Sequence, residues 1–248
     1  RQRQMCIRDR FYIDEKLSIT PGFRFENIST SLDGYYRKIN LDAAGNTIYN
    51  ERFDEKDTKK RKFLLLGLGL SYKNQGFEIY TNFSQNFRSV TFADISIINP
   101  SYAINPSIDD EKGFTFDLGL RGNYKKIVSF DSSIFALIYR DRIGFIQKAF
   151  RDGNVKSERG NVGNAQITGI ESLFDFDVNE ILFKNANLDF NIFFNYSYIE
   201  SKYLKSNEVG ITGKEVEFVP KNNFKSGLKF GYKDFAINFQ YSYLSSQF

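Results

Sequence analysis

The sequence predicts an all-β protein whose antiparallel strands form part of a transmembrane β-barrel. The clearest strand is the stretch from Leu188 to Tyr198, LDFNIFFNYSY, whose even positions are apolar or aromatic and whose odd positions are largely polar. Successive side chains of a strand point to opposite faces, so this stretch has one apolar and one polar face. A soluble sandwich would bury the apolar face in a core, whereas an outer-membrane barrel turns it toward lipid. This strand alone leaves both architectures open.

Composition narrows the fold. Aromatic residues make up 17% of the 248 residues, through 27 Phe and 15 Tyr, and such side chains favour pleated sheets. No run approaches the roughly 18 to 20 apolar residues that a membrane-spanning helix needs. These observations exclude a helical membrane protein but allow a β-barrel, whose alternating strands keep the mean hydropathy low.

Composition also excludes several classes of function. The 34 basic and 30 acidic residues give a net charge of only +4 and are spread along the chain, which does not make a nucleic-acid surface. The absence of histidine excludes serine–histidine hydrolysis and histidine-based zinc sites. The single cysteine, Cys6, cannot form an internal disulfide. We therefore expect no enzyme, no cofactor and no nucleic-acid partner.

The first ten residues, RQRQMCIRDR, differ from the rest of the chain. They are polar, basic and unpatterned, and they lack the apolar centre of a secretory signal peptide. We expect residues 1–10 to be a non-native or unstructured leader and residues 11–248 to form the barrel domain. Because an exported protein carries its signal upstream, we also expect the chain to begin inside a longer protein.

Strands are predicted wherever apolar residues alternate, and the connections between them fall at charged, Gly-rich or Pro-containing stretches. The expected strands, after a stub at Phe11–Ile13, are Leu17–Ile39, Phe63–Lys73, Phe77–Val90, Gly113–Asn123, Ile127–Lys148, Val162–Val178, the stretch opening at Leu188, Phe218–Tyr232 and the stretch from Phe235 onward. Tight turns are expected at Asp14–Lys16, Asn74–Gly76, Tyr124–Lys126, Asn179–Asn187 and Lys233–Asp234, and long loops at Asn40–Lys62, Thr91–Lys112, Ala149–Asn161 and Lys205–Glu217.

Two regularities favour the barrel over the sandwich. Tight and long connections alternate strictly, as in outer-membrane barrels with short periplasmic turns and long extracellular loops. In addition, one face of each strand is free of charge: Phe77, Ile79, Thr81 and Phe83 oppose Glu78 in the clearest case. A Lys or Arg on the lipid face costs roughly 2–4 kcal/mol at the midplane, so each strand has one favoured register. Only the register of residues 127–148 stays open, because both of its faces carry large apolar residues.

The number of strands indicates a fragment. Nine or ten strands of this length leave two unpaired edges, which lipid does not tolerate. Phe248 imitates the terminal aromatic residue of a bacterial barrel, but the lipid phase of the last strand falls on odd positions from Phe235 to Tyr243. Either the barrel closes with few strands or strands are missing. Because Phe248 is out of phase with the last strand, we expect further strands beyond the chain.

Six segments resemble a known family. They are TPGFRFENI (20–28), TNFSQNFRSVTFADI (81–95), GFTFDLGLRGNY (113–124), IYRDRIGFIQ (138–147), GNAQITGIES (163–172) and VEFVPKNNFKSGLKFGY (216–232). Together they resemble the barrel of a TonB-dependent receptor, with most similarity to the ferric-dicitrate-receptor-like branch of Bacteroidetes. The resemblance covers nearly everything from residue 11 onward.

The resemblance implies a barrel of about 22 strands with a plugged lumen, of which this chain would supply roughly strands 11 to 19. The signal peptide, TonB box, plug and last strands would lie outside it. The resemblance also implies import of a ferric chelate or siderophore, with citrate-type ligands favoured, energised by TonB through the missing N-terminal region. It implies a location in the outer membrane of a Gram-negative bacterium, with lipid around the barrel.

Four residues are candidates for binding such a ligand. An anionic ferric chelate needs arginine forks and amide donors at the outer end of the lumen. Asn86 and Arg88 lie in the lumen phase and lead into the second long loop, and Tyr102 and Arg142 are further candidates. We expect no metal ligands and no catalytic group, because the adjacent carboxylates at residues 109–111 belong to a charged loop.

Two other functions fit the same strands. A passive porin-like channel has the same wall without a plug, and it predicts a constricting loop folded into the lumen. A soluble β-sandwich adhesin or structural protein predicts solubility without detergent. The absence of histidine argues against an outer-membrane hydrolase.

Overall fold

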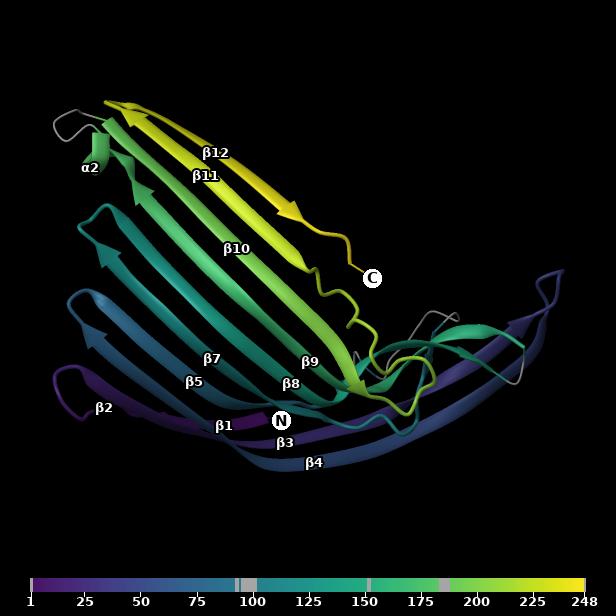
Figure 1. The fold of residues 1–248 in the computed structure, drawn as a ribbon. Coiled ribbons are helices and arrows are strands. Elements are labelled where there is room, and N and C mark those ends of the chain that lie inside the picture. The colour runs from purple at the N-terminus through teal and green to yellow at the C-terminus, as the bar shows by residue number, and fades with distance from the viewer. Residues whose placement is uncertain (1, 92–93, 95–101, 151–152, 183–187, 248) are drawn as a thin grey trace. The chain divides into compact units, whose positions relative to one another are not determined.

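The computed structural model describes residues 2–91, 94, 102–150, 153–182 and 188–247. Strands dominate this part of the chain (Figure 1). They are β1 (Gln2–Arg8), β2 (Phe11–Tyr12), β3 (Leu17–Leu41), β4 (Thr47–Asn74), β5 (Phe77–Arg88), β6 (Tyr102–Ile104), β7 (Glu111–Tyr124), β8 (Val128–Ala149), β9 (Val155–Asp177), β10 (Leu188–Lys205), β11 (Asn222–Tyr232) and β12 (Phe235–Leu244), with a short helix α2 (Val178–Leu182). No helix in the described ranges is long and apolar enough to cross a membrane.

The chain divides into two units, which are described separately. The smaller unit comprises Arg1–Arg8 and Gly22–Leu66, and the larger comprises Asp9–Pro21 and Gly67–Phe248. In the smaller unit, β1 pairs antiparallel with β3. A strand therefore occupies residues where we expected a leader, and whether those residues are native stays a prediction.

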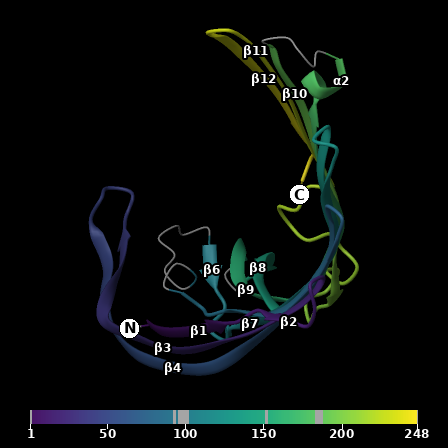
Figure 2. The same cartoon turned by 90° about the vertical axis from the view of Figure 1, so that its left-hand side faces the viewer.

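Neighbouring strands of the larger unit pair antiparallel from β4 to β12, while β6 pairs parallel with β9. Figure 1 shows β5 and β7 to β12 side by side, with their short turns together at one end and their long connections at the other. Figure 2 shows β6 beside the long-connection ends of β8 and β9. The strands pair within one sheet and not in two packed sheets, which argues against a sandwich for the residues described.

The pairing register fixes which face each side chain occupies. Leu118 of β7 lies opposite Ile134 of β8, and Ile134 lies opposite Ile170 of β9. These three side chains are exposed on the charge-free face. The sequence left the register of residues 127–148 open. The structure determines it, because the even residues of β8 lie on the same lipid-facing side as Leu118 and Ile170.

Aromatic side chains on the opposite, lumen-facing side lie over glycines of neighbouring strands. A Cβ added to Gly119 would lie 2.2 Å from the ring of Tyr80, and one added to Gly227 would lie 2.2 Å from the ring of Phe193. Gly169 lies in the same way beneath Phe135. The glycines thus make room for large rings beside the polar residues of the lumen face.

Two expected loops are wrong. Residues 40–62 and 149–161 belong mostly to strands, since β4 begins at Thr47 and β9 begins at Val155. The connections are short: Asp42 accepts hydrogen bonds from the backbone of Ala44 and Asn46, and Gly153 has a φ of 79°. Charged strands can pair outside the membrane, where neither face needs to be apolar, so charge density did not indicate a loop.

Other expectations fall partly on residues that are not described. These are the loop residues 92–93 and 95–101, the loop residues 151–152, the turn residues 183–187 and the terminal Phe248. The last strand has its predicted phase, because Phe230 of β11 pairs with Ile237 and Leu228 pairs with Phe239.

Buried apolar side chains gather at the long-loop end of the larger unit. One cluster contains Val162, Ala165, Tyr203 and Val216, and a second contains Val90, Ile108 and Ile143. The strands, the loop that follows β10 and the loop that precedes β7 meet in these clusters. They hold in place the polar groups described next.

Candidate functional site

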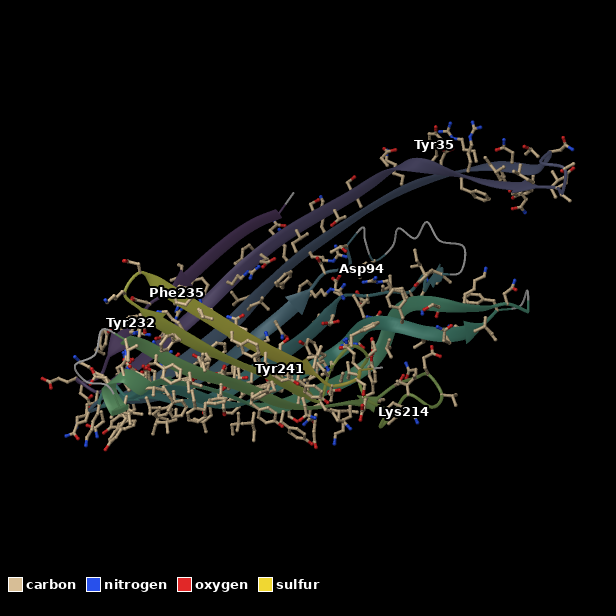
Figure 3. All side chains as sticks on the ribbon, turned by 90° about the horizontal axis from the view of Figure 1, so that it is seen from above. Tyr35, Asp94, Lys214, Tyr232, Phe235 and Tyr241 are labelled. Carbon is tan, nitrogen blue, oxygen red and sulfur yellow. The ribbon has the colours of Figure 1, made fainter. Side chains whose placement is uncertain are left out.

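Arg88, at the end of β5, is held by two carboxylates. Its Nη2 donates a hydrogen bond of 2.7 Å to Oδ1 of Asp94, and its Nη1 lies 3.8 Å from Oε2 of Glu111. The Asp94 side chain is 1% exposed, whereas 41% of the Arg88 side chain is exposed. Figure 3 shows Asp94 at the opposite end of the strands from the turn between Tyr232 and Phe235. The guanidinium is therefore anchored by carboxylates, while the Arg88 side chain as a whole stays partly exposed.

Asp94 is shared by two arginines. Arg159 of β9 also donates to Oδ1 of Asp94, and the backbone amide and hydroxyl of Thr91 donate to Oδ2 at 2.8 Å each. Burial alone would raise the pKa of Asp94, but the Thr91 hydrogen bonds and the charges of Arg88 and Arg159 outweigh it, so the pKa lies below its usual value. Asp94 therefore carries its charge at neutral pH.

Aromatic rings extend this group, which we call the Asp94 cluster: Arg88, Asp94, Arg159, Phe145 and Tyr102. The Arg159 guanidinium lies 4.9 Å from the ring centroid of Phe145. The Tyr102 ring meets Phe145 edge-on, with centroids 5.6 Å apart. Tyr102 reaches this position because β6 pairs with β9, opposite Ser157. Two of the four predicted residues, Arg88 and Tyr102, thus belong to one cluster.

Asn86 lies two residues before Arg88 on the lumen face of β5. Its Nδ2 donates to Oγ1 of Thr115 at 3.4 Å, while its Oδ1 is buried with no hydrogen-bond partner among the described residues. Gly113 leaves the space beside it, since a Cβ there would lie 2.6 Å from that oxygen. An unpaired buried acceptor is uncommon, because burial without a partner costs about 1–3 kcal/mol.

Arg142 belongs to a separate group, the Arg142 cluster: Arg142, Tyr203 and Glu217. Its Nη1 donates to the Tyr203 hydroxyl at 3.0 Å and to Oε1 of Glu217 at 2.7 Å. The Tyr203 hydroxyl donates to Oε2 of Glu217 at 2.6 Å. Burial, together with the Glu217 hydrogen bond, raises the pKa of Tyr203. The cluster joins β8 and β10 to the loop before β11.

A bulge in β8 turns Arg142 toward this cluster. The pairing with β9 shifts register between Tyr139 and Arg142, and Asp141 has a φ of 55°. In an unbroken strand Arg142 would share the lipid-facing side with Ile138, because both positions are even. The bulge moves Arg142 to the side that Tyr203 occupies.

Sequence reasoning missed Asp94, Arg159, Tyr203 and Glu217. The contacts between these residues and the predicted arginines span up to 75 positions, from Arg142 to Glu217. No local spacing could indicate them. The alternation of the stretch opening at Leu188 puts Tyr203 on the lumen side, whereas Arg159 falls in a stretch that was expected to be a loop.

A hollow of about 490 Å³ lies at the other end of the lumen face, beside the short turns. Its charged lining includes Glu78, which accepts hydrogen bonds from Ser71 at 2.6 Å and from Arg121 at 3.0 Å. The four predicted site residues are not part of this lining. In the described part of the chain, no group of three metal-ligating side chains could hold a metal ion.

The sequence matches one family model over residues 2–248, described as the TonB-dependent receptor-like β-barrel. No curated protein matches the sequence.

Several solved structures share the fold. The ferric citrate transporter FecA is 20% identical, with a TM-score of 0.67, covering 99% of this chain and 32% of that one. The ferric yersiniabactin uptake receptor FyuA from Yersinia pestis is 18% identical, with a TM-score of 0.66, covering 97% and 33%. The copper transporter OprC is 15% identical, with a TM-score of 0.69, covering 95% and 34%. The chain thus spans about a third of the length of these proteins.

Proposed function

Because the chain belongs to the TonB-dependent receptor-like β-barrel family, we propose that it is part of a receptor that imports a ferric chelate, energised through TonB. Its family places it in the outer membrane of a Gram-negative bacterium. The chain supplies barrel wall and ligand-facing loops, and it acts as a transporter component and not as an enzyme. The plug and the contact with TonB belong to other parts of the receptor.

The observation that supports a ligand role is that the Arg88 side chain is anchored by Asp94 and still partly exposed. Asp94 fixes its direction through Nη2, while 41% of the side chain stays exposed at the outer end of the lumen face. A fixed arginine fork binds carboxylates with little further loss of conformational freedom. A citrate-type ferric chelate presents such carboxylates, and FecA, which shares the fold, is a ferric citrate transporter.

The other predicted residues have matching roles in this proposal. Asn86 offers its amide Nδ2 as a donor, which is held among the described residues only by a 3.4 Å hydrogen bond to Thr115, and Tyr102 is a partly exposed side chain in the Asp94 cluster. Arg142 contributes positive charge, although its Nη1 is already shared by Tyr203 and Glu217. We therefore rank Arg88 and Asn86 before Tyr102 and Arg142.

The test measures uptake of radiolabelled ferric citrate by cells that produce the full-length receptor. Arg88→Ala is expected to weaken uptake by at least about tenfold, since a hydrogen bond to a charged group contributes about 1.5–3 kcal/mol. Arg121→Ala is the matched control, because it removes an arginine from the other end of the lumen face, where Arg121 donates to Glu78. If both variants lose uptake equally, the effect is not specific to Arg88 and its role in ligand binding is wrong.

A passive porin-like channel is the competing function. It shares the wall of the barrel but needs no TonB, so uptake in cells that lack TonB separates the two.

A further inference from the structure

Two basic residues lie directly opposite each other on the lipid-facing side of the larger unit. Lys112 of β7 pairs with Arg140 of β8. Both positions are even, as are those of Leu118 and Ile134, and both side chains are exposed. Neither forms an ion pair within the described ranges, although Asp141 follows Arg140 and Glu111 precedes Lys112.

The neighbouring carboxylate of Glu111 is engaged elsewhere. It is buried, and its Oε2 accepts a hydrogen bond from the backbone amide of Ile143 and lies 3.8 Å from Arg88. Like charges directly opposite each other on two strands are destabilising. The pair of Lys112 and Arg140 therefore lacks the anion that would balance it.

The pair lies just above the apolar band of the barrel. The next pair on the same face is Phe114 of β7 with Ile138 of β8. The stretches from Phe114 to Tyr124 and from Val128 to Ile138 match the roughly 9–11 residues that a strand needs to cross the membrane. Because the long loops follow, this end is the extracellular one. Lys112 and Arg140 thus reach the headgroup level of the outer leaflet.

A third basic side chain lies on the same face at a similar height. Lys202 of β10 is exposed and pairs with Gln166 of β9, which in turn pairs with Ile138. Lys202 therefore has the same phase and nearly the same height as Arg140, two strands away. Glu200 is the nearest carboxylate on that face of β10, and its Oε1 accepts a hydrogen bond of 2.8 Å from the Tyr198 hydroxyl.

The smaller unit repeats the pattern independently. Along β4, the exposed even positions change from Leu66 and Leu64 to Lys62 and Lys60. Both lysines lack an ion-pair partner among the residues described. Lys56, further along the same face, pairs with Asp33 at 3.3 Å. On β4, as on β7 and β8, basic residues that have no ion-pair partner in the described part of the chain therefore come directly after an apolar stretch of the same face.

We propose that Lys112, Arg140 and Lys202, the outward basic row, bind the phosphate groups of an outer-leaflet lipid. Arginine and lysine suit phosphate, the arginine through its fork and the lysine as a point charge. Acyl chains of the same lipid would lie against Phe114 and Ile138 below the row. Basic clusters beside a membrane-spanning segment attract anionic headgroups by about 1 kcal/mol for each residue. The proposal requires the outer-membrane location but not the transport of a chelate.

The test uses the purified full-length receptor in detergent and diphosphorylated lipid A as the probe. Replacing both charges of the pair, Lys112→Gln with Arg140→Gln, is expected to weaken binding about thirtyfold, which corresponds to about 1 kcal/mol for each charge. The exchange Lys112→Arg with Arg140→Lys keeps both charges and is expected to bind within a few-fold of the wild type. Lys125→Gln with Lys126→Gln, at a periplasmic turn, removes the same charge elsewhere and is expected to have no effect.

Two further arms identify the source of the phosphate. Lipid A without phosphates is expected to bind about as weakly as the Gln variant binds diphosphorylated lipid A, and inorganic phosphate at millimolar concentration is expected not to displace the lipid. Wild-type affinity in the Gln variant, equal affinity for both lipids, or full displacement by phosphate would each overturn the proposal.

Ferric citrate uptake by the same variants separates this proposal from the proposed function. The Gln variant is expected to retain uptake, because Lys112 and Arg140 face away from the lumen. Failure of the wild type to transport ferric citrate, with phosphate-dependent lipid binding intact, would reject the transport function alone.

Discussion

Arg159 donates a hydrogen bond to Asp94, a residue 65 positions earlier in the chain. This contact ties the loop after β5 to β9, and it places a negative charge where Arg88 also needs one. The outer end of the lumen face is therefore organised by a carboxylate that the sequence pattern does not single out.

Protonation of Asp94 should release the loop after β5. The pKa of Asp94 is lowered in the folded chain, so its contribution to stability is present above the unfolded pKa of about 3.9 and is lost as the pH falls through the folded pKa. Limited proteolysis of the full-length receptor should therefore cut this loop faster only below about pH 4. Asp94→Asn should give fast cleavage at neutral pH and remove the pH dependence. Slow cleavage of this variant at pH 7 would contradict the role of Asp94.

Tyr203→Phe should loosen the loop before β11. The substitution removes the hydroxyl that joins Arg142 to Glu217 but keeps the ring in its buried cluster. We expect a loss of about 1.5–3 kcal/mol, the range for a hydrogen bond to a charged group. Urea unfolding of Tyr203→Phe, Glu217→Gln and the double variant should show a coupling of at least 0.5 kcal/mol. Strict additivity would mean that the two residues act independently.

Gly119→Ala should destabilise the barrel, because the new Cβ would lie 2.2 Å from the Tyr80 ring. Overpacking of this kind costs about 1–3 kcal/mol. Thermal unfolding, followed by the change in gel mobility on heating, measures the loss. Combining Gly119→Ala with Tyr80→Ala should recover part of it, since the second substitution removes the ring. A stable single variant would show that the ring can move aside freely.

A lysine should be tolerated on one face of β8 and not on the other. Ile134→Lys places the charge on the lipid-facing side and should cost about 2–4 kcal/mol, whereas Ser133→Lys places it in the lumen at the same height and should cost less than 1 kcal/mol. Folding into lipid vesicles with urea titration gives both values. A larger loss for Ser133→Lys than for Ile134→Lys would mean that the lipid-facing and lumen-facing sides of β8 have been assigned the wrong way round.

The sequence predicts the strands well where one face must meet lipid. The even positions from Phe114 to Leu120 and from Ile170 to Phe176 lie where the alternation puts them, because a charge in lipid is costly. The same rule does not operate beyond the membrane. There, Thr47–Lys62 and Val155–Asn161 are strands although charges occur on both faces.

The arrangement of the candidate site residues was predictable only in part, for a related reason. Arg88 and Asn86 could be placed from the phase of a membrane strand. The partner of Arg88 lies in a loop, and the orientation of Arg142 depends on a bulge at Asp141, so no periodic pattern indicates either one. The register of β8 also needed its neighbours, since Phe130 and Phe135 make both of its faces aromatic.

The most direct test of the proposed function compares uptake of radiolabelled ferric citrate in matched cells with and without TonB, both producing the full-length receptor. The account predicts saturable uptake that disappears without TonB and that weakens with Arg88→Ala. Equal uptake in both strains, rising linearly with concentration, would mean that the barrel is a passive channel.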